Sequence, residues 1–515
     1  MRRRSAQLLL GSLLLPLGIT PVVTGPASAS EPSAPAHSSP AAAHALERAL
    51  ALVEGHRTRS RTTTGTDEQT DATMALLDLR RQYDRLDGGD QATAQRIFAR
   101  PNDDNNDPSF ADAGWSYDTA ERAALQDSCT DRFCVHWIPA GTLDDNGSPS
   151  RHAATQAYVD ATIAAMTKSW DTEITRMYYE RPPGDGADGG GTDLVDVYLV
   201  DTASPDMQVM GYAVPEDNCG HDAAPGSDCT GYMVVDNDMA EAADATDTAS
   251  ELLQDVTAHE FFHLVQFGYD VDEANWLYET TAAWMQEQVY DANNTNRWAV
   301  RYSSMRLTWL PLDEVNGYTE YGNWTFHQLA SERLGKSVVL HAWRNAAGRA
   351  GTNTFGALDA SYRQAGSSFV TEFKNFTSAS LMPSRYWSEG TSFAPATNTK
   401  TWTLGTSKKT TDWWWVSNDH LASHAFEVRP GTSLTGKWKL RITADPRATS
   451  SNTGAVMVVY RDGSVTVRSL AFQGGDRLVS NVPFSNRRVK RVVVSLGNAS
   501  GSDDRKTDFR FTIWR

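Results

Sequence analysis

The sequence predicts an α+β protein in which a helical N-terminal region precedes a domain of mixed strands and helices, and an all-β sandwich domain ends the chain. Three observations predict this order. Apolar residues recur at helical spacing before residue 110, strand-like and helical patterns alternate in residues 111–383, and short alternating runs between Gly and Pro turns fill residues 384–515. A chain of 515 residues is long enough for about two to four domains, each with its own core.

The composition is that of a folded, acidic protein. Hydrophobic residues make up 40% of the chain, which contains 16 Trp. Lys and Arg number 47 against 64 Asp and Glu, which leaves a net charge of −17. Disordered chains are poor in aromatic residues, so a folded protein is expected. The acidic balance argues against nucleic-acid binding, because proteins that follow nucleic-acid phosphates concentrate Lys and Arg.

The first 29 residues have the pattern of a secretory signal peptide. Residues 2–4 are all Arg, residues 8–19 form an apolar run that Pro16 interrupts, and residues 27–29 are a small-x-small cleavage pattern. The alternative, a membrane anchor, needs an apolar stretch of about 18–20 residues. No later segment is apolar enough to span a bilayer. We therefore expect a soluble protein that is secreted and extracellular.

Four cysteines are expected to form two local disulfides. Cys129 and Cys134 are five residues apart, and Cys219 and Cys229 are ten apart. Of the pairings open to four cysteines, the two neighbouring pairs are favoured in the oxidising environment of an exported protein. The alternative is a zinc site with Cys ligands, but the two-residue spacing typical of such sites is missing and no His lies at a matching interval.

Residues 30–110 are predicted to be a leader followed by helices. Residues 30–40 are rich in Ala, Pro and Ser, and helices are expected at 41–55, 74–86 and 91–100. A cleaved propeptide and a permanent part of the fold both agree with this pattern. The polar run at residues 102–107 predicts a solvated linker; calcium binding is the alternative, although the spacing of an EF-hand loop is absent.

Residues 111–383 are predicted to form the central domain. Strands are expected at 133–139, 194–201 and 232–236, and helices at 153–173, 247–267, 275–290 and 323–334. The last third changes character. Its short alternating runs are expected to be strands of an antiparallel β-sandwich, at 425–428, 437–444, 455–460, 465–472, 489–496 and 509–514.

The chemistry is concentrated in the sequence His-Glu-Phe-Phe-His, inside the helix expected at 247–267. Residues four apart lie on one helix face, so His259 and His263 can present two imidazole nitrogens to one metal ion. Glu260 lies beside the first of them, where it can reach a water held by the metal and act as general base. The sequence therefore predicts a catalytic zinc site on this helix.

Catalytic zinc needs a third protein ligand and one open position. The metzincin pattern would place Gly and His where this chain has Gln266 and Tyr269, so that class is excluded. An HExxH helix followed by a helix carrying E-x-x-x-A resembles the gluzincin zinc metallopeptidases. The sequence HEFFHLVQFGYD followed by W-x-x-E-T-x-A-x-W-x-x-E is similar to a group of secreted bacterial metallopeptidases among them.

This resemblance covers about thirty residues strongly and the central domain loosely. It implies a zincin-like fold for residues 111–383, one Zn²⁺ per chain, Glu279 as third ligand, Glu260 as base, and Ala282 and Ala283 as the small residues that let two helices pack closely. The implied function is a secreted zinc-dependent endopeptidase that hydrolyses bonds in a protein or peptide substrate.

The chain departs from thermolysin-like members of that group in two ways. Glu279 follows His263 by only sixteen positions, which leaves three acids between them as weaker ligand candidates: Asp270, Asp272 and Glu273. Ala283 stands where those enzymes have an Asp that orients a ligand histidine, so such a partner must come from elsewhere. Glu287 is either that partner or an acid on the helix surface, and the surface position is the expectation.

A zincin also needs a donor for the oxyanion that forms during attack on a peptide carbonyl. Tyr318 and Tyr321 occupy roughly the place where some gluzincins keep a catalytic Tyr, although an ordinary structural tyrosine is the more common case. His327 and His221 are further candidates. Substrate backbone is expected to pair with an extended segment beside the active-site helix, and residues 231–236 are the candidate strand.

Two other functions stay open from the sequence. A non-catalytic, secreted surface-binding protein would keep the HExxH helix as a relic or as a structural metal site. Its binding would come from the C-terminal domain, where Trp413, Trp414 and Trp415 form a cluster that is expected to be buried at a domain junction or, alternatively, exposed for sugar binding. A zinc hydrolase with a non-peptide substrate would share every ligand. Calcium is a possible second cofactor, and the sequence predicts no oligomeric state.

Overall fold

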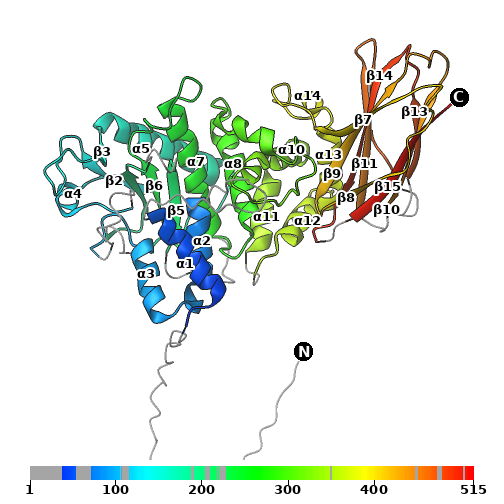
Figure 1. The fold of residues 1–515 in the computed structure, drawn as a ribbon. Helices are drawn as coiled ribbons and strands as arrows, with labels where there is room; N and C mark the ends of the chain where they lie inside the picture. Colours follow the sequence, from blue (N-terminus) through cyan, green and yellow to red (C-terminus); the bar gives the residue numbers. More distant parts are fainter. Residues whose placement is uncertain are drawn as a thin grey trace, which may run out of the picture.

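The computed structural model describes residues 37–53, 71–104, 106, 115–186, 191–202, 209–216, 219, 228–347, 351–446, 451–472, 478–502 and 505–515. The predicted signal peptide lies outside these residues. Figure 1 shows the helices of the N-terminal region below a sheet, a group of helices in the middle, and a β-rich C-terminal region at the far end of the molecule. The α+β class and the β-rich C-terminal region are thus confirmed, whereas the domain boundaries at 110 and 383 stay predictions.

The first half of the chain contains the N-terminal helices, a sheet with the helices that flank it, and the two long helices α7 and α8. Its elements are α1 (Pro40–Val53), α2 (Ala72–Gln82), η1 (Tyr83–Arg85), α3 (Gly88–Phe98), α4 (Thr119–Ala124), β1 (Gln126–Cys129), β2 (Phe133–Pro139), β3 (Ala153–Ala154), α5 (Gln156–Trp170), the π-helical turn η3 (Asp171–Arg176), β4 (Val195–Val200), β5 (Gly211–Pro215), β6 (Gly231–Asp236), α7 (Ala249–Phe267) and α8 (Asn275–Tyr290). The ends of β2 and α8 agree with the predicted ranges.

The sheet has the order β1-β2-β4-β6-β5, with β3 paired to β2. Strands β2, β4 and β6 run parallel, while the outer strands β1 and β5 run antiparallel to their neighbours. The two faces of the sheet are covered by different helices. Successive side chains of a strand point to opposite faces. Tyr198 and Val234 accordingly join the core formed with α1, α2 and α3, whereas Val197 and Met233 join the core that includes α5 and α7.

Strand β5 is the edge of the sheet nearest the site. Its first residue, Gly211, lies so close to α7 that a Cβ there would be 2.7 Å from Cγ1 of Val256 and 3.3 Å from Cγ of Glu260. Real Cβ atoms do not approach carbon so closely, so a glycine is required for this approach. The sequence did not predict β5. Residues 231–236 were expected to be the substrate-binding edge, and this is wrong, because β6 is paired on both sides.

Helices fill the middle of the molecule after α8. They are η4 (Thr295–Tyr302), α9 (Thr319–Gly322), α10 (Trp324–Leu334), α11 (Ser337–Ala346), α12 (Thr354–Gln364), α13 (Phe369–Ala379) and α14 (Pro383–Tyr386). Within the described residues, no helix combines the length and the apolar character that crossing a bilayer requires.

The C-terminal region consists of two sheets. Its strands are β7 (Asn398–Leu404), β8 (Trp414–Asn418), β9 (Ala422–Pro430), β10 (Lys439–Pro446), β11 (Asn452–Tyr460), β12 (Val465–Ser469), β13 (Leu478–Pro483), β14 (Val489–Asn498) and β15 (Arg505–Trp514). One sheet has the order β13-β10-β15-β8 and the other β12-β11-β14-β9-β7, and their facing side chains share one core. The prediction that all pairing is antiparallel is wrong at one place, since β7 runs parallel to β9.

The disulfide prediction is confirmed. Cys129 is bonded to Cys134, and Cys219 is bonded to Cys229. The first pair joins β1 to β2 at their hairpin end, where the two residues face each other in the ladder. Two disulfides fit a protein that folds in an oxidising compartment, as expected for a secreted protein.

Candidate metal centre

Helix α7 carries the HExxH residues in its last three turns. It begins with a capping box, in which the Thr248 side chain accepts from the backbone N–H of Glu251 and the Glu251 carboxylate accepts from the N–H of Thr248. Leu253, Phe261 and Leu264 pack into the core of the sheet. The helix is buried along this length, so its polar side chains at 259, 260 and 263 are withdrawn from bulk solvent.

Three of the predicted residues meet at one point. Nε2 of His259 lies 3.3 Å from Oε2 of Glu279, and Nε2 of His263 lies 3.3 Å from Oε1 of the same carboxylate. The sequence thus named three side chains whose ligand atoms lie within 4.8 Å of one another. Tetrahedral zinc at about 2.0–2.1 Å from each ligand places the ligand atoms about 3.3 Å apart. The donor set and its spacing fit Zn²⁺.

Several of these ligand atoms make no hydrogen bond elsewhere. Nε2 of His263 and both carboxylate oxygens of Glu279 are buried and have no hydrogen-bond partner among the described residues. A buried carboxylate without partners is costly unless a cation or a donor satisfies it. Because these three buried polar atoms face one another, a positive charge between them, carried by a proton or by a metal ion, would satisfy them.

Charge at this point favours a cation. Burial opposes ionisation of Glu279, but the two histidines outweigh it and lower the pKa of Glu279 to about 2. For His263 burial also opposes the charged form, yet the Glu279 carboxylate raises the pKa of the imidazole to about 9. His263 therefore carries a proton beside the ionised Glu279 carboxylate, and a metal ion would replace that proton.

A partner orients the second histidine. Nδ1–H of His263 donates to Oε1 of Gln266 over 2.7 Å, and Nε2 of Gln266 donates to the Tyr278 carbonyl and to Oγ1 of Thr281. These bonds fix the Gln266 amide, so His263 presents Nε2 to the site. The sequence analysis missed Gln266. Its i+3 spacing from His263 on one helix was the signal that could have found it.

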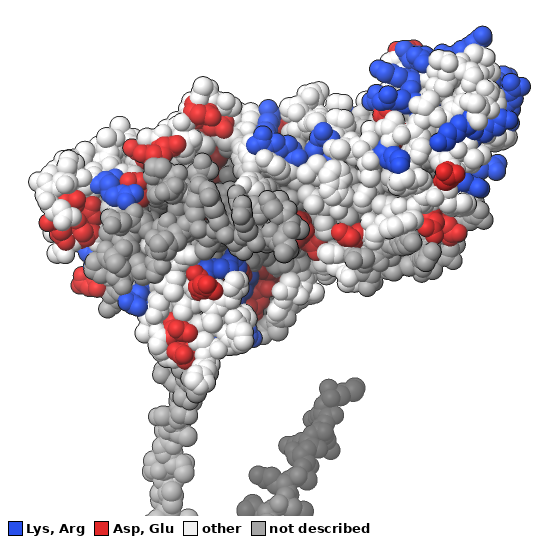
Figure 2. Space-filling model, viewed as in Figure 1, with Lys and Arg blue, Asp and Glu red and all other residues white. Residues whose placement is uncertain are grey.

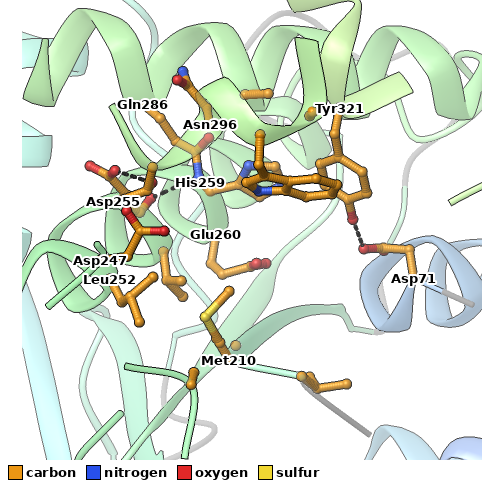
Figure 3. A pocket seen from close by; sticks show the side chains of 18 of the residues that line it. Asp71, Met210, Asp247, Leu252, Asp255, His259, Glu260, Gln286, Asn296 and Tyr321 are labelled. Carbon is orange, nitrogen blue, oxygen red and sulfur yellow. Dashed lines mark hydrogen bonds between the residues drawn. The ribbon is translucent and has the colours of Figure 1, made fainter. Parts of the chain in front are cut away.

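Glu260 lies in a cavity of about 530 Å³ between α7, β5, η4 and α9. Figure 3 shows His259 and Glu260 pointing into this cavity, with Met210 below them and Asn296 and Gln286 above. Burial raises the pKa of Glu260 to about 7, and Glu279 adds to this while His263 and a hydrogen bond from Thr73 act against it. A carboxylate with a pKa near neutrality is suited to accepting and returning a proton.

Residues of α2 enter the site from the N-terminal region. Oγ1 of Thr73 donates to Oε2 of Glu260 over 3.1 Å, and the backbone N–H of Ala213 in β5 donates to Oγ1 of Thr73 over 3.0 Å. Asp71, which caps α2, accepts a hydrogen bond from the Tyr321 hydroxyl, as Figure 3 shows. The sequence analysis missed Asp71 and Thr73, and no spacing signal connects them to residue 260.

The two tyrosine candidates differ in position. Tyr321 stacks beside His259, with ring centroids 6.0 Å apart, and burial raises the pKa of its phenol well above the ordinary value. Tyr318 also lines the cavity, but its ring packs against Tyr302 and Trp298. Tyr321 is therefore the tyrosine whose ring lies against a predicted ligand.

The remaining candidates for a metal ligand or an oxyanion donor are engaged in other contacts or lie outside the described residues. Oε1 of Glu273 accepts from the backbone N–H of Asn353, and Oδ1 of Asp270 accepts from the N–H of Asp272. His327 is buried and hydrogen-bonded to Thr280, and burial lowers its pKa to about 3, which is the behaviour of a core histidine. His221 lies outside the described residues.

Two expectations about side-chain exposure are wrong. Glu287 was expected on the helix surface, yet it is only 4% exposed. Trp413, Trp414 and Trp415 were expected at a buried junction, yet they are 49%, 39% and 58% exposed. Both errors concern contacts with distant parts of the chain, which local sequence does not report.

No protein-family model matches the chain, and no curated protein matches its sequence. Among solved structures, a periplasmic inhibitor of g-type lysozyme from Aeromonas hydrophila is 10% identical over 22% of this chain and 98% of the inhibitor, with a TM-score of 0.15. A 4-O-methyl-α-glucuronidase with specificity for decorated arabinogalactans is 9% identical over 55% of this chain and 46% of that chain, also with a TM-score of 0.15.

Proposed function

We propose that this protein is a secreted, zinc-dependent peptidase of the gluzincin type. One observation carries the proposal: Nε2 of His259 and Nε2 of His263 each lie 3.3 Å from a carboxylate oxygen of Glu279, a separation that tetrahedral zinc requires, and Nε2 of His263 and both Glu279 oxygens are buried without hydrogen-bond partners among the described residues. Glu260 supports it, because an acid with a raised pKa adjoins the ligands and opens into a cavity. Two disulfides fit the secreted location.

Each side chain has one role in the proposed reaction. His259, His263 and Glu279 hold the ion, and bound zinc supplies the Lewis acidity that makes water a nucleophile near neutral pH. Glu260 accepts the proton of the attacking water and passes it to the leaving nitrogen. Tyr321 keeps its proton at neutral pH, because burial raises its pKa. Its hydroxyl is therefore available to the oxyanion once Asp71 no longer engages it.

Metal content tests the site directly. The purified chain is dialysed against zinc without chelators, and zinc is counted by elemental mass spectrometry beside the variant Glu279→Ala. About one zinc per chain is expected for the wild type and much less for the variant. Zinc bound equally by both proteins would contradict the ligand set, and no zinc in either would contradict the proposed function.

Peptide hydrolysis is tested separately on the zinc-loaded chain with a mixed peptide library read by mass spectrometry. New termini that disappear in Glu279→Ala support a peptidase. Full zinc occupancy with intact peptides would reject peptide hydrolysis and favour a structural metal site or a different substrate.

A second function is favoured by the C-terminal region. The outer face of the sheet β13-β10-β15-β8 exposes Trp415 and Trp514, and Trp413 precedes β8 beside it. Cations lie over these rings: Arg510 is 4.7 Å from the Trp413 ring centroid and Lys439 is 4.9 Å from that of Trp514. Figure 2 shows Lys and Arg gathered over this end of the molecule, on the face in view.

Exposed aromatic rings beside cations suit adhesion to an anionic polysaccharide surface, since the rings stack on sugars and the cations pair with acidic groups. Co-sedimentation of the full chain with an insoluble anionic polysaccharide tests this role. We expect Trp415→Ala and Trp514→Ala to reduce binding, and added salt to weaken it. Equal sedimentation of wild type and variants would reject it.

A further inference from the structure

Three carboxylates from two distant parts of the chain meet at the C-terminal end of α8. Glu287 and Asp291 are one helical turn apart, and Glu389 follows α14. One oxygen of each lies within 4.8 Å of the others. Asn296, in the first turn of η4, joins them by donating from Nδ2 to Oε2 of Glu287 over 3.3 Å.

Three oxygens of this cluster have no hydrogen-bond partner among the described residues. Glu287 is 4% exposed, and its Oε1 has no hydrogen-bond partner among them. The same holds for Oε2 of Glu389 and for Oδ1 of Asn296, whose side chain is also buried. A buried oxygen without a partner requires a hydrogen-bond donor or a cation.

The local charge is negative. Arg297 forms an ion pair with Glu389, in which Nη2 lies 2.5 Å from Oε1. Three carboxylates against this one guanidinium leave a formal charge of about −2 when all are ionised, and about −1 at neutral pH, where burial, which raises the pKa of Glu287 to about 8, keeps that carboxyl protonated. The C-terminal end of α8 adds partial negative charge from its last carbonyl groups. A divalent cation would neutralise the cluster.

The ligand type favours calcium over zinc. All four side chains offer oxygen, which calcium prefers and which structural zinc sites seldom use alone. Calcium binds oxygen at about 2.3–2.6 Å, so two of its ligands are at most about 4.6–5.2 Å apart. The carboxylate oxygens lie within 4.8 Å of one another, which is close enough for them to share one such ion.

We propose that Glu287, Asp291, Glu389 and Asn296 form a calcium site, separate from the candidate zinc site. The ion fastens the start of η4 to α8 and to the segment after α14. Thr295, Asn296 and Trp298 of η4 also line the cavity that contains Glu260. Calcium therefore holds one wall of that cavity in place, whether or not the cavity is catalytic.

Calcium binding to the full-length chain tests the proposal. The zinc-loaded protein in calcium-free buffer is titrated with CaCl₂ by calorimetry, with MgCl₂ as a comparison, and its melting temperature is measured with and without 10 mM calcium, about the concentration that saturates a millimolar site. We expect one calcium per chain with a Kd of about 0.1–1 mM and a higher melting temperature. Glu287→Gln and Glu389→Gln should each weaken binding about tenfold or more, because ligand charge tunes calcium affinity. Glu47→Gln, an exposed acid on α1, is the control.

Other results overturn the proposal. No heat of binding together with an unchanged melting temperature rejects the site, and so does calcium binding that both variants retain. If Glu287→Gln stabilises the chain without calcium and the wild type binds none, the cluster is a carboxyl pair that shares a proton. Should Glu287→Gln fail to fold, Glu389→Gln still decides, since Glu389 lies in a segment between helix and strand at the partly exposed side of the cluster.

Discussion

The hydroxyl of Thr73 donates a hydrogen bond to Oε2 of Glu260, although the two residues are 187 positions apart. The same hydroxyl accepts from the N–H of Ala213, so α2, the edge strand β5 and helix α7 meet at one oxygen atom. Thr73 is 2% exposed. A region that sequence left open as a propeptide is therefore in direct contact with the proposed general base.

Replacing Thr73 by Val should shift the pH dependence of activity. The Thr73 hydrogen bond favours the ionised carboxylate and lowers the pKa of Glu260, so its loss raises that pKa. Since the base acts when ionised, the acidic limb of kcat/KM against pH should move up by about one pH unit. Thr93→Val on α3 is the control. An acidic limb that stays in place would show that the hydroxyl does not tune the base.

Glu260→Gln should keep the metal and lose activity. The amide has nearly the shape of the carboxylate but cannot take a proton, and general acid–base catalysis contributes about 10²–10⁴-fold. We expect a loss of that size in kcat with zinc content unchanged. Glu241→Gln removes an exposed acid from the same cavity and should leave kcat close to wild type. Undiminished turnover in Glu260→Gln would remove Glu260 from the mechanism.

Gln266→Ala should weaken metal binding without removing a ligand. The Gln266 amide is the acceptor for Nδ1–H of His263, and loss of such a partner costs about 10- to 100-fold in metal affinity. Competition with a chromophoric zinc chelator measures the change. Gln254→Ala, half-buried on the same helix, should bind zinc like the wild type. Equal affinity in all three proteins would mean that His263 is oriented by packing alone.

Glu173→Gln should stabilise the chain more at high pH than at low pH. Glu173 is fully buried, and its carboxylate oxygens have no hydrogen-bond partner among the described residues. Burial raises its pKa well above 4.5, so the folded state keeps a proton that the unfolded state releases. Stability is then lost as pH rises above about 4.5, and Gln does not titrate.

Thermal melts between pH 5 and pH 8 check this. The difference in melting temperature between Glu173→Gln and wild type should grow with pH, while Glu180→Gln, a neighbouring acid near the surface, should show no trend. A difference that is constant across the pH range would show that the pKa of Glu173 is the same in the folded and unfolded states.

The periodicity of apolar residues predicted the helices and strands in which that periodicity is unbroken. The ranges 133–139 and 275–290 agree with β2 and α8 because alternation and helical spacing persist over their whole lengths. Strand β5 was missed because it has five residues, begins with Gly and ends with Pro. Its strand character comes from pairing with β6 rather than from its own sequence.

The candidate site also combines residues that local sequence spacing brings together with residues that only the tertiary fold brings together. His259 and His263 share a helix, so their spacing alone brings them together, and Glu279 followed from the resemblance. Thr73 and Glu389 reach their neighbours only through the tertiary fold. The exposure of Trp415 likewise depends on a sheet face that its sequence neighbours do not determine.

Helix α2 has a consequence for any peptide that would extend the sheet at β5. The outward N–H of Ala213 is already engaged by Thr73, so an incoming strand must displace that hydroxyl before it can pair there. Binding then requires the Thr73 side chain to leave this N–H, and the apparent affinity is reduced by the fraction of molecules in which the N–H is free. The measured affinity for a peptide would therefore include the cost of breaking a contact that the chain's own N-terminal region makes with the sheet edge.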